Sequence, residues 1–240
     1  MSLSFMKKQG ILKELARVPL FTFNDFIRVS NLPSNYARLY LFRLKKEGLI
    51  FQIEKGKYTL FEDPLIFASF IHTPSYLSFW TAIRVYNFTE QLPIDIMVAT
   101  AKSKKPIVFQ NTKIKFFKTK HLWGYRKFRY RDFDIFIAEK EKCIIDSLLL
   151  KNIPFEEIVK ALGTKELNPK KLIVYARKTK NKSLIKRIGY ICDYFGFNTR
   201  KLLPVLDKNY IPLDPLMNKE GQINKKWRLI KNRSIHDSLA

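Results

Sequence analysis

The strongest constraint on the fold of this chain is a run of helix boundaries near its N-terminus. Pro33 stands where a long helix would begin, and Gly48 stands where that helix would end. Proline suits the first helical position because its missing N–H would have no partner there, and glycine readily takes the conformation that ends a helix. Two shorter helical segments precede this one, over residues 7–17 and directly after residues 21–24, and residues 30–32 form a turn.

A β-hairpin with a basic tip is predicted directly after the long helix. Residues 49–53 and 58–60 have the composition of short strands, and the tip between them carries Lys55 and Lys57. Three helices followed at once by a small basic hairpin are the pattern of a winged helix-turn-helix. In that motif the third helix enters the major groove of DNA and the hairpin contacts phosphates. The sequence therefore predicts a DNA-binding domain over residues 1–62.

Residues 63–240 are predicted to form a second domain, with a small mixed α/β part followed by a helical C-terminal part. A short connecting helix is expected over residues 65–71, and a longer helix over residues 76–86, where aromatic and aliphatic residues recur at helical spacing. The period then changes to that of strands, which we expect over residues 94–100, 107–110, 112–118, 126–130 and 133–138. From residue 142 the helical period returns, with a further helix start expected at residues 198–199. The predicted fold class is α+β.

The charge of the chain favours a polyanionic partner, and the alternative is a solvated basic surface of a lysine-rich protein. Lys and Arg number 45 against 21 Asp and Glu, which gives a formal net charge of +24. A charge of this size bears on partners and association rates. The hydrophobic content of 46% is enough for packed cores, which excludes disorder as the reason for the charge. Cys143 and Cys192 lie in apolar helical pattern and are expected to pack as small hydrophobic residues in a reducing compartment. With no signal peptide and no membrane-length apolar run, we expect a cytoplasmic protein without a membrane partner.

The predicted third helix divides into a core face and a DNA face. Ala37, Leu41 and Leu44 share one stripe that should pack on the first two helices. Near the N-terminal end, where side chains reach base edges, the candidates are Ser34, Asn35 and Arg38. The candidates for phosphate contacts, further along the helix and at the hairpin tip, are Arg43, Lys45, Lys46, Lys55 and Lys57.

Two apolar residues on the outer face of this helix do not fit a simple DNA reader. Leu39 and Phe42 fall opposite the core stripe, where a free winged helix would present polar groups. They either touch thymine methyl groups or dock against the second domain or a partner. We favour docking for Phe42, because it lies too far along the helix to reach base edges easily.

A second basic segment spans residues 102–131 and contains no Asp or Glu. Strand alternation places Lys113 and Lys115 on one face and the apolar side chains between them on the other. This surface is either a second polyanion-binding surface or a solvated face of a lysine-rich protein. Its basic residues are Lys102, Lys104, Lys105, Lys113, Lys115, Lys118, Lys120, Arg126, Lys127, Arg129 and Arg131.

The sequence offers little for catalysis. His72, His121 and His236 are scattered without the spacing of a metal motif, and neither a glycine-rich phosphate loop nor a serine elbow is present. Asp132 and Asp134 would share a strand face, but they lie at a hairpin turn, where surface carboxylates are common. We therefore predict no catalytic residue, no metal and no cofactor.

Several short motifs resemble the AbiEi-type antitoxins, the DNA-binding antitoxins of bacterial and archaeal abortive-infection systems. The resemblance extends from the predicted winged helix to Trp227. The motifs that carry it are Tyr76-Leu77-Ser78 with Trp80 and Ala82, Thr89-Glu90-Gln91-Leu92-Pro93, Val98-Ala99-Thr100, Gly124, the segment from Glu141 and Lys142 to Asp146, and Leu213-Asp214-Pro215 with Gly221 and Trp227.

The resemblance implies an autoregulatory repressor that acts as the antitoxin of a type IV toxin–antitoxin system. Its winged helix would bind inverted repeats in double-stranded DNA of its own promoter. Its functional partner would be a nucleotidyltransferase-like toxin, countered without a stable complex. Glu141, Lys142 and Asp146 would be the family signature in the C-terminal domain, where Asp146 is expected to cap or pair locally.

Two alternatives remain open at the level of sequence. An RNA-binding protein would use the basic segment with aromatic stacking surfaces, for which the candidates are Phe116, Phe117, Tyr125 and Tyr130. A nuclease would use Asp132 and Asp134, and we rank it last because the Glu-x-Lys spacing of such enzymes does not follow them.

Overall fold

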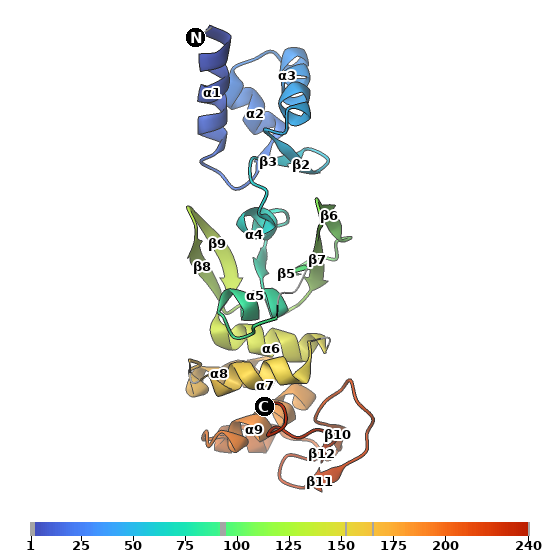
Figure 1. The fold of residues 1–240 in the computed structure, drawn as a ribbon. Coiled ribbons are helices and arrows are strands. Elements are labelled where there is room, and N and C mark those ends of the chain that lie inside the picture. The colour runs from blue at the N-terminus through green and yellow to red at the C-terminus, as the bar shows by residue number, and fades with distance from the viewer. Residues whose placement is uncertain (1–2, 92–94, 152, 165, 240) are drawn as a thin grey trace. The chain divides into compact units, whose positions relative to one another are not determined.

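The computed structural model describes residues 3–91, 95–151, 153–164 and 166–239 (Figure 1). The chain forms two compact units. The first comprises Met1–Leu77, Ile94–Leu122 and Lys127–Ile137, and the second comprises Ser78–Pro93, Trp123–Arg126 and Ala138–Ala240. Helices and strands occur in both, so the predicted α+β class is confirmed. Residues 1–62 lie within the first unit, and their independence as a domain stays a prediction.

The first unit opens with three helices, α1 (Leu3–Leu15), α2 (Phe23–Ser30) and α3 (Ser34–Lys46). Local chemistry sets their ends. Thr22 and Asp25 form a reciprocal capping box at the start of α2, and Asn31 ends this helix in the left-handed conformation. The helices share one core of buried side chains, made of Ile11, Leu15, Phe21, Phe26, Ala37, Leu41, Leu44 and Ile50. The core stripe predicted for α3 is thus confirmed.

The predicted hairpin follows α3. Strands β2 (Phe51–Glu54) and β3 (Lys57–Thr59) pair antiparallel, and β1 (Phe21–Thr22) adds to β3 in a small three-stranded sheet. Gly56 sits at the tip with φ of 79°, a conformation that favours glycine. The pairing of β1 with β3 ties the hairpin to the start of α2.

A six-stranded mixed sheet follows, preceded by α4 (Pro64–Phe67) and a 3₁₀ turn, η1 (Ala68–Phe70), where the short connecting helix was expected. Its strand order is β6-β7-β5-β4-β9-β8. The strands are β4 (Ser75–Leu77), β5 (Ile96–Thr100), β6 (Ile107–Phe109), β7 (Thr112–Lys118), β8 (Tyr125–Tyr130) and β9 (Phe133–Ala138). Five of these were predicted within a residue or two, and β4 was not; the first expected residue of β5, Ile94, lies outside the described residues.

The prediction of one helix over residues 76–86 is wrong at its start. Ser75–Leu77 form strand β4, paired with β5, and the helix α5 covers only Phe79–Val85. All three residues of β4 are buried, so the strand lacks the alternation that marks a half-exposed strand. Phe79, the first residue of α5, has a positive φ of 56°, so the backbone is not continuously helical from β4 into α5.

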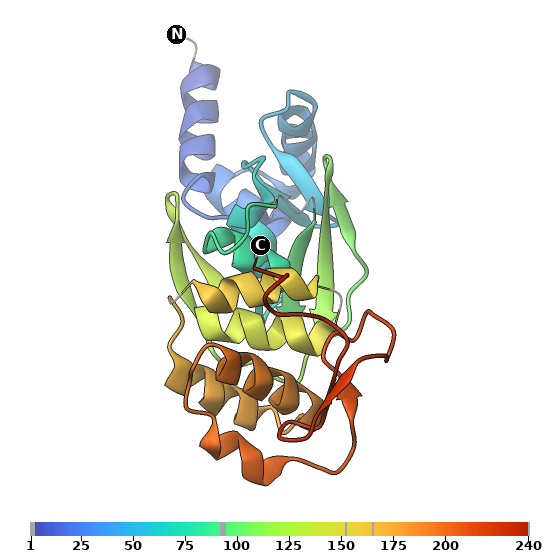
Figure 2. The ribbon, with the colours of Figure 1, turned by 60° about the horizontal axis from the view of Figure 1, so that its bottom comes forward.

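The second unit is mainly helical. After α5 it contains α6 (Lys140–Leu150), α7 (Phe155–Gly163), α8 (Pro169–Lys178) and α9 (Lys182–Tyr194). Helix α6 is buried along most of its length and contacts each of the other four (Figure 2). Asn168 and Asn181 accept backbone N–H groups at the starts of α8 and α9, where asparagine is a favoured capping residue.

The end of the second unit differs in detail from the sequence prediction. The expected helix after residues 198–199 is a 3₁₀ helix, η2 (Arg200–Val205), which contains Pro204. The extended chain beyond it includes β10 (Ile211–Pro212), and two strands that were not predicted, β11 (Gln222–Asn224) and β12 (Leu229–Lys231), complete a small sheet.

Cys143 and Cys192 are both buried, as predicted, and neither forms a disulfide. No helix within the described ranges combines the length and the apolar character needed to cross a membrane.

Candidate nucleic-acid interface

The three base-edge candidates lie together on the exposed face of α3. Ser34 and Asn35 are the first two residues of the helix, and Arg38 follows one turn later. All three side chains are exposed, while Ala37 beside them is buried in the core. The packing of α3 on the other helices therefore leaves this polar end of the helix directed to solvent.

Arg38 is held in place by an aromatic ring. Its guanidinium carbon lies 5.6 Å from the centroid of Phe23, the first residue of α2. A planar guanidinium over an aromatic face is weakly attracted to it and loses part of its rotational freedom. The sequence reasoning missed Phe23 in this role, because nothing in its spacing to Arg38 signals the contact.

A hollow of about 350 Å³ lies between α3 and the hairpin, and Phe42 forms part of its wall. Phe42 is 61% exposed and Leu39 is 44% exposed, so both lie on the outer face as predicted. Whether they contact thymine methyl groups or a partner stays a prediction. The hollow is lined by Phe23, Arg38, Leu41, Phe42, Lys45, Gln52, Lys55, Gly56 and Tyr58.

The phosphate candidates divide into exposed cations and one that is engaged within the protein. Arg43, Lys46 and Lys55 are exposed. Lys45 is exposed as well, and its ammonium donates to the Gln52 side chain at 2.7 Å, which links α3 to β2. Lys57 is different.

The Lys57 ammonium lies 3.0 Å from a Glu54 carboxylate oxygen and donates to the carbonyl of Ile71. Glu54 also accepts from Lys104 at 2.6 Å. Burial alone would raise the pKa of the Glu54 carboxyl, but the two ammonium groups outweigh it and hold that pKa below its usual value. Lys57 therefore fixes the hairpin to the chain before β4, and Lys55 is left as the exposed cation of the tip.

The second basic segment does not form one continuous face. Ile114 and Phe116 are buried and Lys113 is exposed, so the predicted alternation along β7 is confirmed. However, β7 and β8 are separated in the sheet by β5, β4 and β9. The basic residues of β7 and those of β8 thus lie toward opposite edges of the sheet. The positions of the others along the chain are as follows: Lys102, Lys104 and Lys105 in the loop before β6, Lys118 at the end of β7, Lys120 after it, and Arg126, Lys127, Arg129 and Arg131 in β8 and its turn.

Part of this basic charge is neutralised by acids from outside the segment. The ion pairs are Lys104–Glu54 at 2.6 Å, Lys115–Asp95, Arg131–Asp63 at 3.2 Å and Arg129–Asp134 at 3.7 Å. Two of the four aromatic residues of the RNA alternative, Phe116 and Tyr130, are also engaged in the fold. Phe116 is 9% exposed, and the Tyr130 hydroxyl donates to Asp63 at 2.8 Å.

The predicted signature residues form an internal network in the second unit. Lys142 and Asp146 make a buried ion pair one helical turn apart on α6, and the Ser78 hydroxyl donates to Asp146 at 2.7 Å. Burial lowers the pKa of the Lys142 ammonium, although Asp146 opposes the shift. Glu141 accepts the backbone N–H of Asn168 at 2.7 Å. The local pairing expected for Asp146 is confirmed.

The indole of Trp123 lies against this network. The Lys142 ammonium is 4.8 Å from its ring centroid, and the Lys178 ammonium is 4.6 Å from it. Neither contact was foreseen from the sequence, because the residues lie on separate segments. The Lys142 ammonium is thus paired with a buried carboxylate and lies beside an indole, within the packing of α6.

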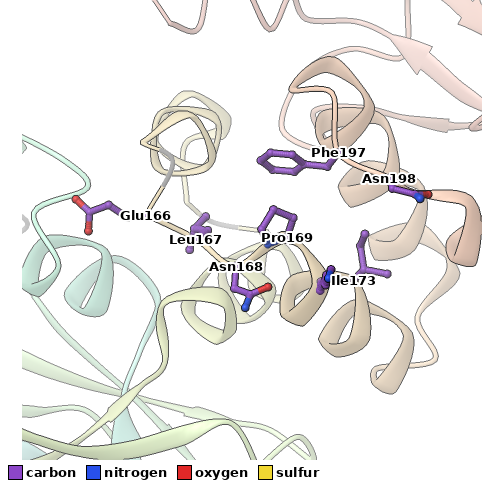
Figure 3. A pocket seen from close by; sticks show the side chains of 8 residues that line it. Glu166, Leu167, Asn168, Pro169, Ile173, Phe197 and Asn198 are labelled. Atoms are coloured by element: carbon purple, nitrogen blue, oxygen red, sulfur yellow. The ribbon is translucent and has the colours of Figure 1, made fainter.

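A separate hollow of about 620 Å³ lies at the start of α8 (Figure 3). Leu167, Pro169, Ile173 and Phe197 form its apolar lining, and Asn168 already accepts the backbone N–H of Lys171. Within the described ranges, no group of three or more His, Cys, Asp and Glu side chains is placed to hold a metal ion.

Comparison with known proteins gives a fold neighbour. The chain matches the crystal structure of the Rv2827c protein from Mycobacterium tuberculosis with a TM-score of 0.65 and 12% sequence identity, over 95% of this chain and 92% of that one. At this identity the match shows a shared fold. No family model and no curated protein sequence matches the chain. The resemblance to AbiEi-type antitoxins therefore rests on the sequence motifs.

Proposed function

We propose that this protein binds double-stranded DNA in a sequence-specific manner and represses transcription, with α1–α3 and the β2–β3 hairpin acting as a winged helix-turn-helix. The observation that carries the proposal is the exposure of Ser34, Asn35 and Arg38 at the start of α3, with Arg38 oriented by Phe23. Asparagine pairs with adenine and arginine with guanine through two hydrogen bonds each.

The packing of α3 supports this orientation. Its apolar stripe is buried in the three-helix core, so the opposite face is the one available to a groove. The cations placed to contact phosphates are Arg43, Lys45 and Lys46 on α3 and Lys55 on the hairpin. Phosphate contacts fix the register of the protein on the duplex, and contacts to base edges select the sequence.

The sequence motifs extend the proposal to an antitoxin. In this proposal the protein is not an enzyme, needs no cofactor, and acts in the cytoplasm. It represses its own promoter and counters a nucleotidyltransferase-like toxin without a stable complex. Co-expression tests this part: expression of a neighbouring nucleotidyltransferase-like gene should arrest growth, and the protein should restore it. Continued arrest would contradict the antitoxin function and leave DNA binding unaffected.

Binding to the protein's own upstream DNA tests the central proposal. Fluorescence anisotropy would compare that DNA with scrambled duplex of equal length and with structured RNA, over a salt series. Sequence-specific binding predicts tighter association with the upstream DNA that persists as salt is raised. Equal and steeply salt-dependent binding to both duplexes would show that the charge of +24 acts without sequence selection. Tighter binding to RNA would support the RNA alternative.

A further inference from the structure

Leu39 stands in the middle of the face of α3 that is directed away from the core. It lies opposite the buried stripe of Ala37, Leu41 and Leu44, and its side chain is 44% exposed. Asn35 precedes it by one helical turn on the same face, since side chains four residues apart on a helix are neighbours. The exposed face therefore presents an amide first and an apolar side chain next, in the part of α3 that the proposed function places against bases.

The charges around Leu39 favour a polyanion over a protein as the partner of this face. Arg38, Arg43 and Lys46 are exposed cations of the same helix, and no acidic residue occurs between Ser34 and Lys46. The core of a protein–protein interface is depleted in charged residues. A protein that covered Leu39 would have to desolvate these cations or pair them, whereas the phosphates of DNA neutralise them.

The hollow beside Phe42 has the same charge. Arg38, Lys45 and Lys55 line it, and no carboxyl group is among its lining residues. Phe42 is 61% exposed and stands about one turn beyond Leu39, next to the cations proposed to contact phosphate. Phe42 thus lies on the phosphate side of this face, which leaves Leu39 as the exposed apolar side chain nearest to the base-edge candidates.

The major groove offers one apolar group on the base edges, the 5-methyl group of thymine. Asn35 and Leu39 are separated by about 6 Å along the axis of α3, at a rise of about 1.5 Å per residue. Base pairs are stacked about 3.4 Å apart, so two side chains with this spacing reach bases at most about two base pairs apart. Leu39 is therefore placed to meet a methyl group close to the base that Asn35 contacts.

We propose that Leu39 selects thymine in the bound DNA, through contact of its side chain with the 5-methyl group of that base. The selected thymine lies within about two base pairs of the base contacted by Asn35. This contact rests on the proposed function, because α3 must lie in the major groove for it to form. An apolar residue then adds to the base choice made by Asn35 and Arg38.

Single replacements of thymine by deoxyuridine in the upstream DNA test the proposal, because each removes one methyl group and leaves base pairing intact. Fluorescence anisotropy would measure the affinity of the full-length protein for every substituted duplex. We expect a loss of about fourfold at one thymine of each binding site, the effect of removing one buried methyl group. Leu39→Ala should bind the unsubstituted duplex more weakly, and the same deoxyuridine should then have no further effect.

Two other variants serve as controls. Val18→Ala truncates an apolar side chain of similar exposure, 41%, in the same unit, and should keep the affinity of the wild type for every duplex. Phe42→Ala should keep the loss at the deoxyuridine position, because Phe42 does not contact that methyl group. Leu39→Ala should leave the salt dependence of binding unchanged, because it removes no charge. Thermal unfolding by circular dichroism checks that each variant is folded, and Leu39→Ser replaces Leu39→Ala if the latter does not fold.

The outcomes separate the proposal from the proposed function. If the wild type prefers the upstream DNA but no deoxyuridine weakens it, the assignment of Leu39 is overturned and the proposed function stands. The same conclusion follows if the deoxyuridine effect persists in Leu39→Ala, or if it is lost in Phe42→Ala instead. A change in sedimentation velocity of the free Leu39→Ala protein without a change in thymine preference would place Leu39 against a second copy of the chain and reject the proposal. Equal binding of upstream and scrambled duplex by the wild type would reject the proposed function and this contact with it.

Discussion

Gly189 and Trp227 fit together so closely that any side chain at position 189 would overlap the indole. A Cβ atom built on Gly189 would lie 2.1 Å from the nearest ring carbon of Trp227. The indole is 1% exposed, and its Nε1 donates at 2.6 Å to Asp193, one turn further along α9. The absent side chain of Gly189 thus creates the place where the C-terminal segment docks on α9.

Gly189→Ala should destabilise the protein by roughly 2–3 kcal/mol, because the indole must move from a close-packed site. Gly10→Ala is the matched control, since Gly10 lies in α1 with open space around it. There the substitution should stabilise slightly, because alanine favours the helix. Urea unfolding followed by circular dichroism measures both. Equal effects of the two substitutions would contradict the packing argument.

The buried ion pair of α6 should be intolerant of single substitutions. Lys142→Met leaves the Asp146 carboxylate buried without its cation, and a cost of about 3–5 kcal/mol is expected. The double variant Lys142→Met, Asp146→Leu should cost less than Lys142→Met alone. Arg17→Met, which breaks the exposed pair with Glu14, is the control and should change the free energy of unfolding by less than about 1 kcal/mol. A double variant as unstable as the single would refute the pairing.

Asp193 should make stability depend on pH in acid. Burial alone would raise the pKa of its carboxyl, but hydrogen bonds from Lys226, Thr199 and Trp227 outweigh it and hold that pKa below its usual value. A carboxyl with a lower pKa in the folded state stabilises the fold above its unfolded pKa, and this contribution is lost as pH falls through the folded pKa. Asp193→Asn should therefore be less stable than wild type at pH 7, and the difference should shrink below about pH 4. Urea unfolding at pH 7, 4 and 3 measures it; a constant difference would be inconsistent with this linkage.

Asn35→Ala should relax base choice at one position of the bound DNA. One paired amide contributes roughly 1–3 kcal/mol of discrimination between bases. Competition binding with duplexes substituted at each position in turn would locate the base. A uniform loss of affinity for every duplex would show that Asn35 does not read a base.

Lys55→Ala should weaken binding to all duplexes alike. If Lys55 contacts a phosphate, its removal should reduce the slope of log affinity against log salt by about 1. Lys57→Ala is the comparison, because the ammonium of Lys57 is engaged by Glu54 and Ile71. It should leave the salt slope unchanged. The same change of slope in both variants would place both lysines on phosphate.

Local signals explain which parts of the fold were predictable. Asn31 and Pro33 mark the turn before α3, and Gly48 follows the end of that helix. Asn31 and Gly48 take the left-handed conformation that their residue types tolerate, and Pro33 fits the start of a helix. The wrong start of the helix after residue 75 has a tertiary cause. Tyr76 is buried in β4 between two other strands, and a short strand buried on both faces has no period that distinguishes it from a helix.

The candidate site was also predictable only in part, where local sequence pattern determines exposure. Exposure of Ser34, Asn35 and Arg38 followed from the helical wheel of α3. The pairing of Lys57 with Glu54 and Ile71 did not, because a strand-tip lysine has the same sequence context whether it contacts solvent or a distant carbonyl.

Strand β4 joins the two sides of the six-stranded sheet through very little backbone. It pairs with β5 over Ser75–Leu77, and its register with β9 is set by Leu77 and Ile137. By contrast, β5 pairs with β7 over five consecutive residue pairs, from Ile96 with Ile114 to Thr100 with Lys118. The amides between β4 and β9 should therefore lose protection from hydrogen exchange at a lower free energy of opening than those between β5 and β7. The sheet should open first between β4 and β9.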